Sequence, residues 1–229
     1  MSDRPKPRPP LSRERIVDTA IALVDAEGLG ALTMRRLGAE LGMDPMAVYY
    51  YVPNKAALLD AVVEAVMAEI DLGVDDPSAA AEERLINAAK AYAEVLVRHR
   101  NALPLLLVRG PATPAALAPV EVMVAILRSG GLPPEHAMAG MHVLTAAVRG
   151  YAAIIANEMT DPGNRDSEAL VALASPEQFP YLSEAAAQPR QGTQAAFEFG
   201  LRAIAIGVLG VREAGQISGS TDSIRVAPV

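Results

Sequence analysis

The chain has 229 residues and a formal net charge of −7; 51% of its residues are hydrophobic, 4% are aromatic and none is cysteine. Such an apolar fraction supports a sizeable core and excludes wholesale disorder, while the lack of cysteine excludes disulfides, thiolate metal sites and thiol catalysis. Ala, Leu and Val dominate, which favours helices over strands. No uncharged apolar run approaches the roughly 18 residues of a membrane span, so we expect a cytoplasmic protein without a membrane partner.

The charged residues are unevenly distributed along the chain. Residues 1–55 hold eight Lys/Arg against seven Asp/Glu, whereas the remainder holds twelve against twenty. Five of the N-terminal cations precede Ile16, and four prolines lie in residues 1–11. We therefore expect residues 1–11 to form a flexible basic arm. A weakly basic head on an acidic body is compatible with binding to nucleic-acid phosphates.

Two helices are predicted directly after this arm. Ser12 can cap the first, whose apolar residues recur at helical spacing as far as Val24. Gly28 and Gly30 end it, since glycine tolerates the backbone that follows a helix. Thr33 can cap a short second helix that carries two inward leucines at positions 37 and 41.

A tight turn and another short helix follow. Gly42 makes the turn, and Asp44 with Pro45 forms a cap followed by proline at the first helical position. This helix must be short, because Pro53 disfavours helix at the residue before it. Asn54 can cap a fourth helix, from about 55 to 70. Two short helices joined by a glycine turn are typical of a helix-turn-helix, whose second helix enters the major groove of DNA.

The rest of the chain predicts a larger helical body. After an acidic break at 71–81, the pattern predicts helices over 82–99, 101–110, 115–128, 134–159, 181–187 and 193–213, with a loop at 160–176. The predicted fold is all-α: a three-helix head at 12–65, a connecting helix at 55–70, a body at 66–215 and a flexible tail at 216–229.

Motifs of catalysis and metal binding are missing from the sequence. The histidines, His99, His136 and His142, are scattered, and no nucleophile motif, phosphate loop or His–Glu ligand pair occurs. We expect no catalytic residue, metal or cofactor. Two alternatives stay open: a helical enzyme, and an interaction module that does not bind DNA, because the predicted recognition helix at 45–51 lacks Arg, Lys, Asn and Gln.

These segments resemble the DNA-binding domain of the tetracycline-repressor (TetR) family. The runs that carry the resemblance are LTMRRL at 32–37, LGM at 41–43, AVYYYVPNK at 47–55 and ALL at 57–59. The run FEFGL at 197–201 resembles the last helix of the tetracycline-repressor-type C-terminal domain. The resemblance implies a homodimer formed by the last two long helices, operator DNA as a partner, and an inducer pocket in the body. Because the predicted helix at 55–70 belongs to both domains, we expect a small-molecule inducer to release the repressor by moving this helix.

The resemblance also implies which residues contact the operator. Arg35 occupies a position that often reaches a base edge, where arginine can bind guanine bidentately. Tyr49 and Tyr50 can place hydroxyl groups on phosphates, and Lys55 lies where the family contacts phosphate. We predict that Arg35 makes most of the hydrogen-bonded base contacts. The full predicted set is Thr33, Arg35, Asp44, Pro45, Met46, Ala47, Tyr49, Tyr50 and Lys55.

Long apolar helices with few inward polar residues suit a small-molecule pocket in the body. His142, Thr145 and Arg149 share one helix face with Met138. Plainer interpretations are that the methionines are core, that His142 is structural, and that Arg149 pairs with an acid across a dimer. The predicted lining set is Tyr92, Leu96, Leu106, Arg109, Met123, Met138, His142, Thr145 and Arg149.

The sequence also bears on the inducer. Family members that bind tetracycline hold its magnesium chelate with imidazoles near the ends of the fourth and sixth helices. Here those regions read Glu69-Ile70-Asp71 and Leu105-Leu106-Leu107. We therefore do not expect magnesium–tetracycline as inducer, and instead expect an apolar ligand near 105–108 with Arg109 facing any anionic group.

Overall fold

The structure is a computed structural model that describes residues 11–110, 113–160, 175–189 and 192–211. Within these ranges every regular element is a helix, which confirms the predicted fold class. The predicted arm up to residue 10, the loop over 161–174 and the tail lie outside the described residues.

The helices of the head are α1 (Arg13–Glu27), α2 (Met34–Leu41), α3 (Pro45–Tyr51) and α4 (Lys55–Ala68). Those of the body are α5 (Ala81–Arg98), α6 (Leu103–Val108), α7 (Ala118–Ser129), α8 (Pro134–Thr160), α10 (Pro180–Ala186) and α11 (Thr193–Gly210). Short 3-10 turns add η1 (Leu29–Ala31), η2 (Leu72–Val74), η3 (Arg100–Ala102) and η4 (Ala115–Leu117).

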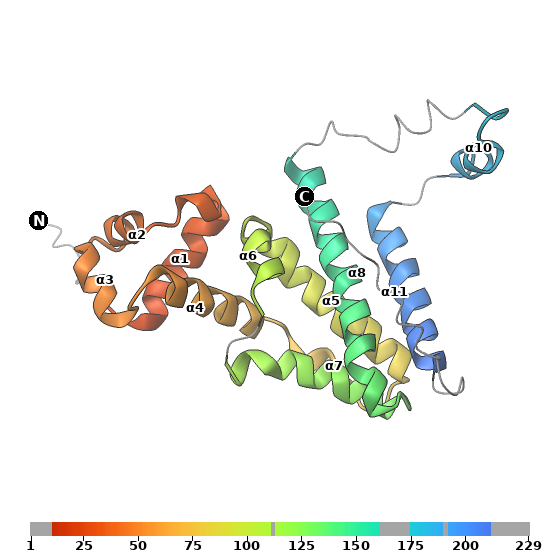
Figure 1. Ribbon diagram of the computed structural model, residues 1–229, viewed down its shortest axis with the longest axis horizontal. Coiled ribbons are helices and arrows are strands. Elements are labelled where there is room, and N and C mark those ends of the chain that lie inside the picture. Colours follow the sequence, from red (N-terminus) through yellow and green to blue (C-terminus); the bar gives the residue numbers. More distant parts are fainter. Residues whose placement is uncertain (1–10, 111–112, 161–174, 190–191, 212–229) are drawn as a thin grey trace, which may run out of the picture.

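Helices α1, α2 and α3 form a small head at one end of the molecule, and α4 leads from it to the body (Figure 1). The head is held by buried apolar residues from all four helices, among them Ile16, Leu37, Val48 and Leu58, each 0% exposed. Since the buried residues of each helix recur at helical spacing, each short helix buries one face and exposes the opposite face to solvent. Tertiary packing of this kind stabilises helices too short to persist alone.

The predicted caps of the head are all present. The side chains of Ser12, Thr33, Asp44 and Asn54 accept hydrogen bonds from backbone amides two or three residues later, at 2.8 to 3.2 Å. Gly42 ends α2 in the left-handed region, at φ 67° and ψ 34°, a conformation that glycine adopts without steric cost. Local hydrogen bonds therefore fix where each head helix begins and where the turn falls.

Helices α5, α8 and α11 run side by side in the body, with α7 across one end of the bundle (Figure 1). Their facing sides are apolar, and Leu85, Leu144 and Leu201 are each at most 1% exposed. By length and mean hydropathy α8 is the one helix of the described residues that could span a membrane. This test does not assign a membrane partner, because a core helix of a water-soluble protein passes it too. Here α8 packs mainly against α5, α7 and α11, and it also contacts α6 and η3.

Candidate DNA-binding face and ligand cavity

Helix α3 protrudes from the head. Only Val48 of its seven residues is buried, and it anchors the helix on the head core. Met46 and Tyr50 are 72% and 86% exposed, so the opposite side of α3 is free to approach a large partner. A single short helix that is anchored by one face and capped at its start has the size and exposure needed to enter a major groove about 12 Å wide.

The nine residues predicted to contact DNA all lie at or near the surface of the head. None is buried, and seven are exposed, whereas Pro45 and Ala47 are half-buried. Thr33 and Asp44 each use a side-chain oxygen to cap a helix. At the start of α3 the amides are already used, because Pro45 has no N–H, Met46 donates to the side chain of Asp44 and Ala47 donates to the backbone carbonyl of Asp44.

Two neighbouring arginines in α2 are placed differently. Arg36 donates to Glu27 at 2.6 Å and to Glu40 at 2.7 Å, so its guanidinium is held within the head. The bond to Glu27, followed by that to Glu40, holds the pKa of Arg36 above its ordinary value. Arg35 is exposed, and its side chain has no hydrogen bond or ion pair to any residue that the structure describes. Its five N–H donors are therefore available to another molecule.

Gly38 permits the close contact between α2 and α3. A β-carbon at this position would lie 3.1 Å from the carbonyl oxygen of Met43 and 3.2 Å from backbone atoms of Pro45. Those atoms belong to the turn and to the start of α3, so they cannot move aside without moving the helix. Sequence reasoning missed Gly38, although a glycine inside a short amphipathic helix is a signal of close backbone approach.

The body contains a cavity of about 380 Å³ with mainly apolar walls, a volume in the range of small-molecule sites. Met67 of α4 and Ile70, just beyond the end of α4, line one side, and α5 contributes Ala88 and Tyr92. Helices α7 and α8 supply the remaining long walls, with further contacts from η2 and η4. The cavity therefore lies against the same helix that carries the head.

Six of the nine predicted lining residues meet in this cavity: Tyr92, Met123, Met138, His142, Thr145 and Arg149. The other three do not line it. Leu96 and Leu106 are core residues, 0% and 3% exposed. Arg109 forms an ion pair with Asp60 of α4, so it faces that helix rather than a ligand. The expectation of an apolar site at 105–108 is corrected accordingly, since only Gly110 of this region borders the cavity.

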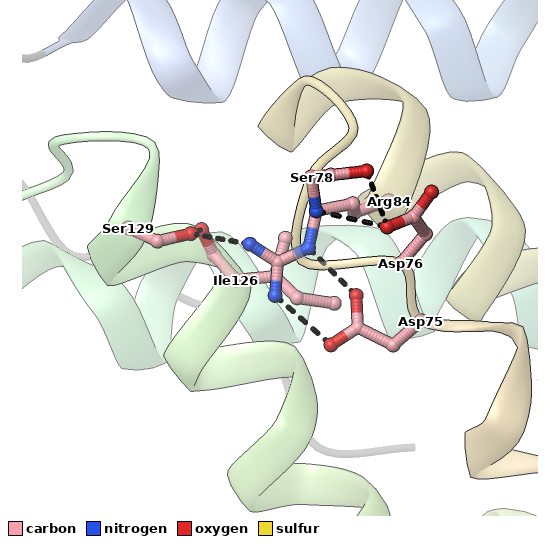
Figure 2. Close-up of polar contacts among 6 residues, drawn as sticks. All are labelled: Asp75, Asp76, Ser78, Arg84, Ile126 and Ser129. Carbon is pink, nitrogen blue, oxygen red and sulfur yellow. Dashed lines mark hydrogen bonds and ion pairs between the residues drawn. The ribbon is translucent and has the colours of Figure 1, made fainter.

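A network of polar side chains, drawn in Figure 2, includes Asp75, which lines the cavity. Arg84 of α5 donates to both carboxylate oxygens of Asp75, at 2.6 and 2.9 Å, and to Ser129 at the end of α7 at 3.0 Å. The hydrogen bond from Arg84 holds the pKa of Asp75 below its ordinary value. Asp75 also lines the cavity, and its charge there is compensated by the guanidinium.

A second polar cluster joins the head to the body, and we call it the head–body joint: Asp25, Glu69, Arg98, His99 and Asn101. His99 is 4% exposed, with Nδ1 at 2.8 Å from Oδ2 of Asp25 in α1 and Nε2 at 3.0 Å from Oε2 of Glu69 at the end of α4. Asn101 donates to the backbone carbonyl of Asp25 at 2.7 Å, and Arg98 donates to Glu69 at 2.8 Å. Through its two ring nitrogens His99 therefore links α1 to the end of α4.

Glu69 connects this joint to the cavity. Its burial by itself would raise its pKa, but the hydrogen bonds and charges of His99 and Arg98 outweigh the burial and hold the pKa below the ordinary value. Its neighbours Ile70 and Asp71 line the cavity. Sequence reasoning missed the joint, because nothing local relates Asp25, Glu69 and His99, which come from three separate segments.

Comparisons with known proteins match both parts of the chain. The family described as "Bacterial regulatory proteins, tetR family" matches residues 16–62, and "Tetracyclin repressor-like, C-terminal domain" matches residues 75–211. The HTH-type transcriptional repressor DrrR1 of Streptomyces coeruleorubidus is 31% identical over 64% of this chain and 54% of its own length. The tetracycline repressor protein class E of Escherichia coli is 28% identical over 86% of this chain and 90% of its own.

Solved structures agree with these matches over the whole fold. The apo structure of ActR from Streptomyces coelicolor has a TM-score of 0.79 and 28% identity, covering 92% of this chain and all of ActR. The structure of ActR in complex with actinorhodin has a TM-score of 0.76 and 29% identity, covering 90% of this chain and all of ActR.

Proposed function

The chain belongs to the tetracycline-repressor family of bacterial regulators, and from this premise we propose that it is a ligand-responsive transcriptional repressor that binds operator DNA as a homodimer. The observation that carries the proposal is the capped, protruding α3, which is anchored only through Val48. It acts in the cytoplasm, where the operator is, and has no catalytic role. The named relatives are regulators rather than enzymes.

Base reading is assigned mainly to Arg35. Its guanidinium is uncommitted, whereas that of Arg36 is held by two glutamates. An uncommitted arginine can bind guanine O6 and N7 bidentately. The exposed side chain of Met46 offers apolar contact to a thymine methyl group. The hydroxyl groups of Tyr49 and Tyr50 and the ammonium of Lys55 then hold the phosphates on either side.

Dimerisation is assigned to the outer faces of α8 and α11. Large apolar side chains are exposed there, including Ile154 at 53% and Phe199 at 73%. Covering such side chains by a second copy removes them from water. A twofold dimer presents two α3 helices to one duplex and requires half-sites about one helical turn, roughly 34 Å, apart.

Release is assigned to α4, because its end borders both the cavity and the head–body joint. A ligand among Met67, Ile70 and Asp71 acts on the segment that carries Glu69, and Glu69 is bonded to His99. If the ligand prefers an arrangement in which the two heads no longer match the half-sites, ligand and operator weaken each other's binding by the same factor. The ActR complex with actinorhodin supports a small-molecule inducer for this chain.

The test is selection of DNA by the purified full-length chain from a pool of random duplexes, with native mass spectrometry of the free protein. We expect enrichment of a palindromic sequence and a dimeric mass. A Tyr49→Ala/Tyr50→Ala variant should still dimerise but bind DNA of every sequence more weakly, because these tyrosines contact phosphates. A chain that stays monomeric, or that enriches no sequence at low salt, would contradict the proposal.

A further inference from the structure

We infer that the cavity takes an anionic amphiphile: an apolar molecule that carries one carboxylate or similar oxyanion, held by Arg149. The inference rests on the proposed function, whose ligand it specifies. The starting observation is an arginine without an ion-pair partner. Among the described residues that line the cavity Arg149 is the only arginine or lysine, and it is half-buried.

Arg149 has one polar partner in the described part of the chain. Its Nε donates to the hydroxyl of Tyr92 at 3.1 Å, and no described carboxylate forms an ion pair with it. Tyr92 is 5% exposed, so this bond fixes one edge of the guanidinium. The two Nη groups keep four N–H donors, the arrangement that receives a carboxylate bidentately.

The acidic residues at the cavity do not neutralise Arg149. Asp75 is already paired with Arg84 through both oxygens (Figure 2). Asp71 is exposed, and its Oδ1 accepts from the amide of Gly73 at 2.8 Å. A partly desolvated cation without a counter-charge is unfavourable, and a bound anion removes that cost. Because Asp71 would repel a second anion at its edge, the ligand carries its charge at one end only.

The rest of the cavity selects an apolar body. Its walls include Met67, Met123, Met138 and Met141, together with Ile70 and Val120. Methionine side chains adapt to irregular shapes and make favourable contacts with aromatic rings. Thr145 adds little polarity, because its hydroxyl already donates to the backbone carbonyl of Met141 at 3.0 Å. The ligand class is therefore a ring-containing acid rather than a sugar, a nucleotide or a cation.

The experiment uses two fluorescent probes with the same ring skeleton and titrates each into the full-length protein. One is 8-anilinonaphthalene-1-sulfonate, which is anionic, and the other is N-phenyl-1-naphthylamine, which lacks the sulfonate. A charge-assisted pair contributes about 1.5 to 3 kcal/mol, so we expect the anionic probe to bind about 10- to 100-fold more tightly. Arg149→Met should abolish this preference while changing the affinity for the neutral probe less than about threefold.

Two further variants distinguish the loss of the Arg149 contact from misfolding of the protein. Arg149→Lys keeps the charge without the bidentate geometry and should keep an intermediate preference. Arg202→Met is the matched control, because Arg202 is an exposed arginine of α11 that pairs with Glu82; it should leave the preference unchanged. Equal binding of the two probes by the wild-type chain, or an unchanged preference in both Arg149 variants, would overturn the inference. Operator selection is independent of this result, so the ligand assignment can fail while the proposed function stands.

Discussion

The DNA-binding face and the ligand cavity are built in different ways. The face draws its residues from positions 33–55, and side-chain caps and one glycine turn set its geometry. The cavity draws residues from positions 67–149, on helices brought together only by tertiary packing. Local hydrogen bonds thus determine the geometry of the DNA-binding face, whereas packing between distant segments determines the geometry of the cavity. The two regions should therefore respond separately to substitution, except at the joint between them.

The largest separate effect is expected from Gly38→Val. The added side chain meets backbone atoms of Met43 and Pro45 and displaces α3. Overpacking against backbone costs about 3 kcal/mol, so operator affinity should fall about 100-fold. Fluorescence titration of the selected operator measures this loss. Binding of the anionic naphthalene probe should stay within about twofold; a matching loss of probe binding would break the distinction between the two regions.

Arg35→Ala sharpens the comparison within the head. Loss of a bidentate base contact costs about 1 to 3 kcal/mol, so affinity for the selected operator should fall roughly 5- to 100-fold. Affinity for unrelated DNA should change much less. Arg36→Ala is the control, since it removes a neighbouring cation whose partners are Glu27 and Glu40. If Arg35→Ala keeps the operator preference, Arg35 does not read bases.

His99→Leu tests the joint, where the two regions meet. It leaves the carboxylates of Asp25 and Glu69 without their shared partner. We expect the free energy of unfolding in urea to fall by about 1 to 2 kcal/mol. Amide exchange should rise at the ends of both α1 and α4. The conservative variant His99→Gln should restore part of the protection. Exchange that rises in only one of the two helices would exclude a role for His99 in joining them.

Acid should produce the smallest effect. Folding lowers the pKa of Glu69 below its ordinary 4.5 and that of Asp75 below its ordinary 3.8. A carboxylate whose pKa is lowered by folding stabilises the fold above its unfolded-state pKa, and this stabilisation is lost as the pH falls through the folded value. Unfolding free energy should therefore decrease below about pH 4.5, and Glu69→Gln should flatten that slope when urea unfolding is measured at several pH values. An unchanged slope would assign the acid sensitivity to other carboxylates.

The DNA-binding face and the cavity also differ in how much of each could be predicted from the sequence. The helix starts at Ser12, Thr33, Asp44 and Asn54 were predicted because each cap bonds an amide within three residues. The α8 side of the cavity was predicted because Met138, His142, Thr145 and Arg149 share a helical face.

Contacts between distant segments could not be predicted in this way. Leu96 and Leu106 are apolar residues of body helices, as many lining residues are, but both pack in the core. The role of Arg109 depends on Asp60, which lies on another helix. The direction in which a buried side chain points is set by its neighbours in space, and helical periodicity does not specify it.

The recognition helix itself has a practical consequence. Met46 is 72% exposed and caps nothing, and no residue of α3 carries a charge. Introducing Asn or Gln at codon 46 would add an adenine reader without breaking any internal bond of the head. Substitutions at one or two positions of α3 should therefore change the DNA sequence that the chain prefers. They should leave the ligand specificity of the cavity unchanged, because no residue of α3 lines it.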